Sequence, residues 1–246
     1  MTIRLFHVSD LHFGRADGEA LNWFERLVHA EKPTAVVCTG DLTMRARSAE
    51  YKAARVWLER LGVPVTIEPG NHDIPYHNPL MRLLSPYRRY RAVERALERP
   101  IDLPGVMLVP LKTTARFQWR TNWAYGRVSK DGLREALAQL KTRTPGTVAI
   151  VACHHPLIDG AHVHGEAKTD GGKAALDALA AAGADAVLSG HVHDPFDVAH
   201  PVGGRTVRLI GAGTLSERLR TSRPSFNELI VKDGVLEVKP RIFELA

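Results

Sequence analysis

Short apolar runs alternate with amphipathic segments along most of this chain, and the alternation predicts strands and helices in turn. Six runs have the length of buried strands: Ile3–Val8, Ala35–Thr39, Val65–Glu68, Val106–Leu111, Val148–Cys153 and Ala186–Ser189. Apolar residues at helical spacing predict helices over Gly18–Ala30, Ala49–Leu61, Lys130–Leu140 and Lys173–Ala182. This alternation indicates an α/β protein with largely parallel strands.

Two regions depart from the alternation. Pro79–Ala96 is rich in arginine and is predicted to be a basic helical segment. Beyond residue 193 the pattern predicts strands alone, at Phe196–His200, Thr206–Gly211, Phe226–Lys232 and Val235–Ile242. Asp233-Gly234 between the last two apolar runs is typical of a tight hairpin turn. We therefore expect antiparallel strands to complete the sheets.

Five of the six apolar runs end at a polar cluster. The clusters are Asp10 with His12, Asp41, Asn71 with His72 and Asp73, His154, and His191 with His193. The carboxyl ends of buried strands commonly lead into the loops of an active site. We therefore expect the five clusters to meet at one edge of a sheet and to form a metal site.

The donor types in these clusters indicate which metals the site would take. The candidate ligands are Asp10, His12, Asp41, Asn71, His154, His191 and His193. Carboxylate, amide and imidazole donors without a thiolate suit Mn, Fe, Zn, Co or Mg. Seven donors exceed one tetrahedral site but suit two divalent ions that share a bridging carboxylate, about 3.5–4 Å apart. Such a pair binds a phosphoryl oxygen and generates a bridging hydroxide that attacks phosphorus, so the set predicts phosphoester hydrolysis.

The order Asp-x-His, Gly-Asp, Gly-Asn-His-Asp, His, Gly-His-x-His resembles the calcineurin-like metallophosphoesterases, over the span Asp10 to His193. The resemblance implies an α/β fold, a four-layer α/β/β/α sandwich of two mixed sheets flanked by helices. It also implies two ligand sets with Asp41 as the bridge. The first ion would be held by Asp10, His12, Asp41 and His193, and the second by Asp41, Asn71, His154 and His191.

The same resemblance implies roles for the residues around Asn71. His72 would not bind metal; with Asn71 it would face the substrate phosphate, where it stabilises charge or protonates the leaving group. His72 is therefore the expected catalytic residue. Asp73 would form hydrogen bonds that support the site rather than bind an ion.

Residues between the motifs narrow the substrate class. Met44 stands where protein Ser/Thr phosphatases carry an aspartate that partners the catalytic histidine, which disfavours a phosphoprotein substrate. An intact His72 disfavours the lipid A pathway pyrophosphohydrolases, which usually have arginine there. The remaining resemblance is to small bacterial phosphodiesterases of the class III cyclic nucleotide and glycerophosphodiester types. The alternatives are a small-molecule phosphomonoesterase, a DNA nuclease and, least favoured, a non-catalytic metal-bound scaffold.

Composition is compatible with a single phosphoesterase domain over residues 1–246. No run of eighteen apolar residues and no signal peptide is recognisable, so we expect a cytoplasmic enzyme without membrane contact. Cys38 and Cys153 fall in predicted strands and suggest no disulfide. A formal charge of +6 and a pI near 9.5 suit an anionic substrate. A small phosphoester is favoured over nucleic acid as the partner, and the sequence leaves a homo-oligomer open.

Some residues outside the motifs are weaker candidates for the substrate pocket. His162 and His164 lie in a glycine-flanked loop, and Trp119 and Trp123 lie with Arg116 in a polar-aromatic loop. Exposed positions are favoured for the two histidines, and packing is favoured for the tryptophans over nucleobase stacking.

Three further residues lie close to the motifs in sequence. His155 should point away from His154 by strand alternation and have a structural role. Arg218 and Arg220 could steer phosphate, but solvated charges are the favoured interpretation.

Overall fold

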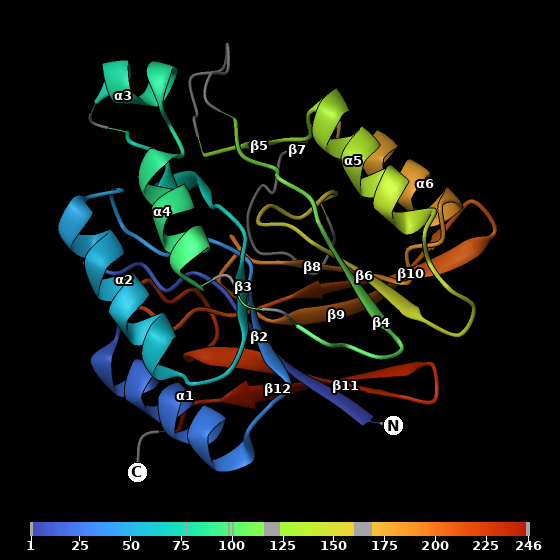
Figure 1. Cartoon of the computed structure of the whole chain (residues 1–246), viewed down its shortest axis with the longest axis horizontal. Coiled ribbons are helices and arrows are strands. Elements are labelled where there is room, and N and C mark those ends of the chain that lie inside the picture. Colours follow the sequence, from blue (N-terminus) through green and yellow to red (C-terminus); the bar gives the residue numbers. More distant parts are fainter. Residues whose placement is uncertain are drawn as a thin grey trace.

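The computed structural model describes residues 2–76, 78–97, 99, 101–115, 124–159 and 169–244. Two five-stranded mixed sheets stack face to face, and helices cover both outer faces (Figure 1). This is the four-layer α/β/β/α arrangement expected from the sequence, and the fold prediction is confirmed.

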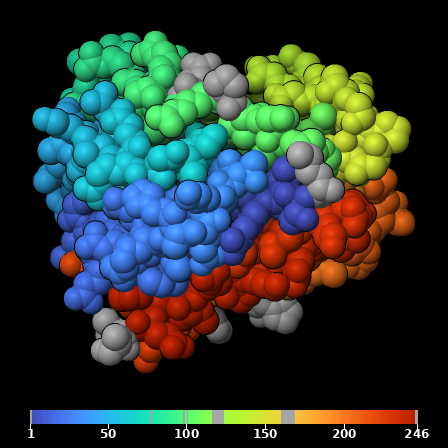
Figure 2. All heavy atoms as spheres, turned by 60° about the horizontal axis from the view of Figure 1, so that its bottom comes forward, coloured from blue at the N-terminus to red at the C-terminus, as the bar shows by residue number. Residues whose placement is uncertain are grey.

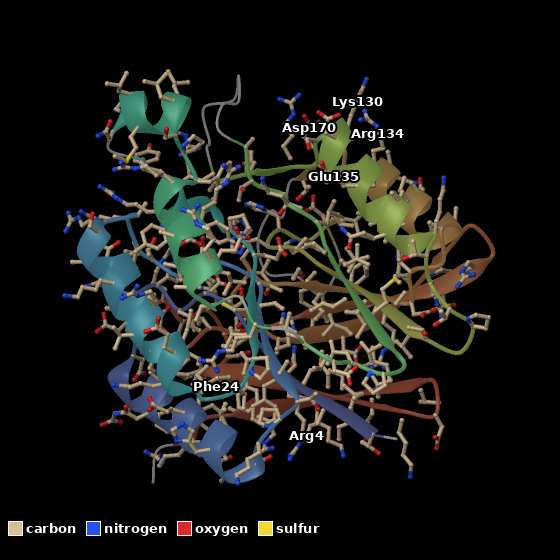
Figure 3. All side chains as sticks on the ribbon, viewed as in Figure 1. Arg4, Phe24, Lys130, Arg134, Glu135 and Asp170 are labelled. Atoms are coloured by element: carbon tan, nitrogen blue, oxygen red, sulfur yellow. The ribbon has the colours of Figure 1, made fainter. Side chains whose placement is uncertain are left out.

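The first sheet has the strand order β12-β11-β1-β2-β3. Its strands are β1 (Thr2–Val8), β2 (Ala35–Cys38), β3 (Val65–Ile67), β11 (Ser225–Lys232) and β12 (Val235–Ile242). β1, β2 and β3 are parallel, whereas β11 and β12 are added antiparallel. The helices on its outer face are α1 (Gly18–Glu31), α2 (Ser48–Arg60) and α4 (Arg88–Leu97). Phe24 of α1, labelled in Figure 3, packs against Phe6 and Phe226 of the sheet with ring centroids 6.0 and 4.9 Å away.

The second sheet has the order β4-β6-β8-β10-β9. Its strands are β4 (Val106–Pro110), β6 (Val148–Ala152), β8 (Ala186–Ser189), β9 (Phe196–Val202) and β10 (Arg205–Gly211). All are parallel except β9, which pairs antiparallel with β10 at the edge. The helices α5 (Lys130–Leu140) and α6 (Gly172–Ala181) cover its outer face. Residues such as Leu5, Val37, Ile150, Leu188 and Leu229 form the apolar layer between the two sheets.

The basic segment that was predicted as one helix is divided in two. α3 (Pro79–Leu84) ends before Ser85, which has φ −149° and ψ 55°, and α4 begins at Arg88. Pro86 explains the break, because a proline lacks the N–H that continues a helix and disfavours helical geometry at the residue before it. A second feature absent from the sequence interpretation is a two-residue parallel pair, β5 (Gly126–Arg127) with β7 (Thr169–Asp170).

Segments from opposite ends of the chain lie together in the first sheet. Figure 2 shows the blue N-terminal segment against the red C-terminal strands, and β1 pairs with β11 from Thr2 to His7. Ion pairs connect the same segments: Arg241 binds Glu31 at 2.8 Å and Glu228 at 2.9 Å, and Arg4 (labelled in Figure 3) pairs with the same two glutamates.

Within the described ranges, no helix combines the length and apolar character that a membrane crossing requires.

Candidate metal centre

Three of the polar clusters follow β1, β2 and β3 of the first sheet, and two follow β6 and β8 of the second sheet. They meet at the carboxyl ends of these strands, so the site is formed by two sheets and not, as expected, by one edge of a single sheet. In the first group, His193 Nε2 lies 3.0 Å from Asp10 Oδ1 and 3.2 Å from His12 Nε2. His12 Nε2 in turn lies 3.7 Å from Asp41 Oδ2. All four side chains are buried. The structure thus brings together the four residues expected around a first ion.

The second group is built around the same aspartate. His154 Nε2 lies 3.5 Å from Asp41 Oδ2 and 3.1 Å from Asn71 Oδ1. His191 Nδ1 lies 3.1 Å from the same Asn71 oxygen. Asp41 Oδ2 therefore faces both groups, which is the position of a bridging carboxylate.

Main-chain carbonyls fix the orientation of two of these imidazoles. His154 Nδ1 donates to the carbonyl oxygen of Thr39 at 2.8 Å, and His193 Nδ1 donates to that of Arg218 at 2.5 Å. Because a carbonyl can only accept, each ring has a proton on Nδ1 and directs Nε2 into the cluster. Asp10 Oδ1 is also buried and has no hydrogen-bond partner among the described residues. Imidazole nitrogens and carboxylate oxygens that face one another in this way fit divalent cations.

The charges of the carboxylates and imidazoles in the cluster also favour the binding of cations. Burial alone would raise the pKa of Asp41, but the neighbouring His154 and His72 lower it well below its ordinary value. Burial opposes protonation of His154, yet the Asp41 carboxylate outweighs it and raises the pKa of His154 to about 9. The carboxylates therefore attract protons to His154 and His193, whereas burial lowers the pKa of His12 and of His191.

Five of the seven candidate ligands have left-handed backbone conformations. Their φ angles are 56° at Asp10, 45° at His12, 52° at Asp41, 72° at His191 and 64° at His193. Such angles are uncommon outside glycine, although aspartate, asparagine and histidine adopt them more readily than other residues. Clustering of unfavourable backbone angles is typical of functional sites. These residues lie directly after β1, β2 and β8, where the left-handed angles set the direction in which the donors leave the strands.

Glycines before the ligands allow the loops to approach one another. A Cβ at Gly70 would lie 2.0 Å from Asp41 Oδ1, and a Cβ at Gly190 would lie 1.8 Å from Ser9 Oγ. Both distances are far inside van der Waals contact. The Gly-Asn-His and Gly-His-x-His patterns thus require glycine for packing.

His72 and Asp73 stand beside the ligands. His72 Nδ1 donates to the main-chain carbonyl of Met44 at 2.8 Å, so a backbone oxygen takes the place of the carboxylate partner that this chain lacks. Asp73 is buried and accepts backbone N–H groups from Leu42, Thr43 and Gly70 at 2.9–3.1 Å. Asp73 thereby ties the loop after β2 to the loop after β3, consistent with a supporting role.

The expected orientation of His155 is wrong. Its ring centroid lies 4.7 Å from that of His154 and 4.6 Å from that of His191, because β6 ends at Ala152 and strand alternation no longer applies. Both ring nitrogens nevertheless have protein partners, Thr113 Oγ1 at 2.9 Å and the carbonyl of Ala124 at 3.0 Å. These bonds agree with a structural role.

The favoured interpretation of Arg218 as a solvated charge is wrong, because the side chain is half-buried and contacts two histidines of the candidate site. Its Nη1 lies 3.0 Å from His72 Nε2 and 3.3 Å from His12 Nε2, whereas Arg220 is exposed as expected. No sequence signal separates the two arginines, because their difference depends on how the loop after β10 folds. The remaining candidates Arg116, Trp119, Trp123, His162 and His164 lie outside the described residues.

Comparison with known sequences gives two matches. The sequence model of a family described as calcineurin-like phosphoesterase matches residues 3–195. The chain is also 34% identical over 82 residues to the glycerophosphodiester phosphodiesterase GpdQ of Enterobacter lignolyticus. That match covers 28% of this chain and 29% of the relative, so it spans less than a third of either protein.

Solved structures share the fold over nearly the whole chain. A dimetal phosphatase from Danio rerio superposes with a TM-score of 0.70 at 14% identity, covering 97% of this chain and 96% of that one. The purple acid phosphatase PPD1 from yellow lupin gives a TM-score of 0.71 at 14% identity, covering 98% and 52%. The protein TT1561 from Thermus thermophilus gives 0.59 at 19% identity, covering 97% and 99%. At these identities the likeness is one of fold.

Proposed function

Because this chain belongs to the calcineurin-like phosphoesterase family, we propose that it is a dinuclear metal-dependent phosphodiesterase acting on small phosphodiesters. The substrate would be of the glycerophosphodiester or cyclic nucleotide type. The observation that carries the dinuclear assignment is Asp41 Oδ2, which lies 3.7 Å from His12 Nε2 and 3.5 Å from His154 Nε2. The partial likeness to a glycerophosphodiester phosphodiesterase supports a diester substrate over a monoester.

The proposed ligands divide into the two groups that the distances define. Asp10, His12, Asp41 and His193 would hold one ion, and Asp41, Asn71, His154 and His191 the other. When bound, two divalent ions supply Lewis-acid stabilisation of phosphoryl oxygens and lower the pKa of water, which then serves as the nucleophile. The donor set suits Mn, Fe, Zn, Co or Mg.

We assign His72 to the leaving-group side of the phosphorus. Its ring is held by the Met44 carbonyl through Nδ1, so Nε2 is the nitrogen directed toward the site. In the structure this nitrogen accepts from Arg218 Nη1. Once released, Nε2 would take up a proton from solvent and pass it to the departing alkoxide oxygen as its bond to phosphorus breaks. Asn71, whose side-chain oxygen lies between His154 and His191, would contribute its amide to the substrate phosphate from the same turn.

The substrate class is tested with two artificial esters. Metal-stripped protein is reconstituted with Mn and assayed on bis(p-nitrophenyl) phosphate and p-nitrophenyl phosphate. We expect strictly metal-dependent hydrolysis with kcat/KM at least about 10-fold higher for the diester, a difference of about 1.4 kcal/mol in transition-state stabilisation. Preference for the monoester would instead indicate a small-molecule phosphatase. If neither ester were hydrolysed, both the phosphodiesterase and the phosphomonoesterase hypotheses would be contradicted.

The role of His72 is tested by His72→Ala with Met44→Leu as its control. His72→Ala should keep two equivalents of metal but lower kcat by about 10²–10³-fold, the usual contribution of a general acid. Met44→Leu retains the main-chain carbonyl that holds the ring, so its activity should remain close to that of the wild type. Full activity in His72→Ala would remove His72 from the mechanism.

A further inference from the structure

Arg218 enters the candidate metal centre from a loop distant in sequence from every ligand motif except Gly-His-x-His. The loop, residues 212–224, joins β10 to β11. The side chain of Arg218 is half-buried, with Nη1 3.0 Å from His72 Nε2 and 3.3 Å from His12 Nε2. One guanidinium nitrogen therefore contacts both the proposed catalytic histidine and a proposed ligand.

The loop is fixed to the segments that carry the ligands. Thr214 Oγ1 donates to the carbonyl of Asp10 at 2.6 Å, and the carbonyl of Arg218 accepts from His193 Nδ1 at 2.5 Å. Asp194 accepts the backbone N–H groups of Thr221 and Ser222 further along the loop. The loop that carries Arg218 is thus held by contacts that do not involve the arginine side chain, and the guanidinium is presented to the site before any substrate arrives.

The charge of this guanidinium is not neutralised within the part of the chain that the structure describes. The side-chain contacts of Arg218 there are both to imidazole nitrogens, and no carboxylate lies within ion-pair distance. Arg241 is the contrasting case, because it is paired with Glu31 and Glu228. A half-buried guanidinium beside the candidate metal ligands, with no carboxylate partner among the described residues, is suited to bind an oxyanion.

We propose that Arg218 is a substrate-binding catalytic residue that donates hydrogen bonds to a non-bridging oxygen of the substrate phosphate. The proposal rests on the phosphoesterase function proposed above. When the guanidinium turns to the phosphate it leaves His72 Nε2, and that nitrogen can then take up from solvent the proton that it gives to the leaving group. The arginine thus binds the charge that grows on the phosphoryl oxygens in the transition state and couples substrate arrival to release of the histidine.

The chain offers a matched control for this assignment in Arg220. It lies two residues further on in the same loop and is exposed. We expect Arg218→Ala to lower kcat/KM on the preferred ester by about 100-fold, as loss of an oxyanion donor does. Arg218→Lys should recover about a tenth of the activity, because it keeps the charge without the planar fork. Arg220→Ala should stay within about twofold of wild type, as a surface substitution does.

Two measurements other than turnover separate substrate binding from a structural role. Metal content should stay at two equivalents in Arg218→Ala, because the bond to His193 comes from the main chain. Calorimetric titration of inorganic phosphate into the metal-loaded proteins should show affinity at least about 10-fold weaker for Arg218→Ala and unchanged for Arg220→Ala. Unchanged phosphate affinity, or loss of metal from Arg218→Ala, would overturn the proposal.

The same titration distinguishes this inference from the proposed function. If neither ester is hydrolysed by the wild type, the phosphodiesterase assignment fails. A weakened phosphate affinity in Arg218→Ala would even then support the arginine as the oxyanion-binding residue of the site.

Discussion

Asp41 and Glu68 are carboxyl groups that follow the neighbouring parallel strands β2 and β3, and their surroundings set their charge in opposite directions. Asp41 is buried among imidazoles, and His154 and His72 outweigh the effect of burial and lower its pKa. Burial and the nearby Glu94 together raise the pKa of Glu68 to about 8, against the weaker influence of Lys112. A strand end that carries a carboxylate becomes a metal site only where other strands bring their donors to it.

The cavities around Glu68 illustrate the difference. One of about 410 Å³ is lined by Glu68, Glu94 and Arg95 beside the apolar edges of β3 and β4. Another of about 330 Å³ shares Glu68 and Glu94 and continues toward Lys112. No imidazole is among the described residues that line either cavity, and the charge of Glu94 raises the pKa of Glu68. We expect Asp41 and Glu68 to respond differently to substitution.

The largest expected contrast is between Asp41→Ala and Glu68→Gln. Asp41→Ala removes the one oxygen that faces both ligand groups, so it should abolish uptake of both ions and lower turnover on the order of 10⁴-fold. Glu68→Gln should bind two ions and retain its activity. Metal content by mass spectrometry and esterase assays decide this, and two ions retained in Asp41→Ala would show that the carboxylate is not a bridge.

A smaller effect is expected when the loop beside Asp41 is displaced without removal of the ligand. A Cβ at Gly70 would lie 2.0 Å from Asp41 Oδ1, so Gly70→Ala should shift that carboxylate and lower kcat/KM about 100-fold. Gly18→Ala is the control, since nothing lies within 4 Å of its added carbon. Equal activity of the two variants would mean that the close approach of Gly70 is unimportant for the geometry of the site.

Glu68 itself is expected to affect stability rather than activity. Its pKa is about 8 in the folded protein against an ordinary value of 4.5, so the folded state binds the proton more tightly. The free energy of unfolding contributed by this proton is fully present below pH 4.5 and is lost as the pH rises through 8. Because the side chain is partly exposed, we expect Glu68→Gln to be more stable than wild type by only about 1–2 kcal/mol at pH 9.

Urea unfolding of both proteins at pH 6 and pH 9 measures this difference. If the difference in free energy of unfolding between Glu68→Gln and wild type were the same at both pH values, Glu68 would already be ionised at pH 6.

The smallest expected effect concerns the neighbour of Glu68. Glu94 is exposed, and its charge contributes to the raised pKa of Glu68. Glu94→Gln should therefore lower that pKa and reduce the pH dependence of stability by a few tenths of a kcal/mol. The same urea titrations apply, and an unchanged dependence would leave burial as the sole cause.

The clustering of the candidate ligands was predictable because each cluster follows an apolar run and parallel strands bring their carboxyl ends together. That the clusters come from two stacked sheets, and not from one, was not predictable from the local pattern. His155 and Arg218 were not predictable in the same way. The position of His155 depends on the bend of the chain after β6, and that of Arg218 on hydrogen bonds between a loop and the turns that carry Asp10 and His193. Local sequence patterns do not record such contacts between distant segments. The break at Pro86 was missed for another reason: arginines continue on both sides of it, so the segment has one composition although it forms two helices.

The left-handed turns at Asp10, His12, Asp41, His191 and His193 restrict which sequences can inherit this site. Aspartate, asparagine, histidine and glycine tolerate such angles far better than branched or bulky residues. A substitution by another donor residue, such as cysteine or glutamate, would have to adopt the same left-handed backbone angle. The conformational energy of that angle would destabilise the variant whatever the affinity of the new side chain for an ion. At these five positions a single substitution would therefore remove a candidate donor more readily than replace it with another. The backbone geometry thus disfavours exchange of these candidate ligands for cysteine, the ligand that softer metals prefer.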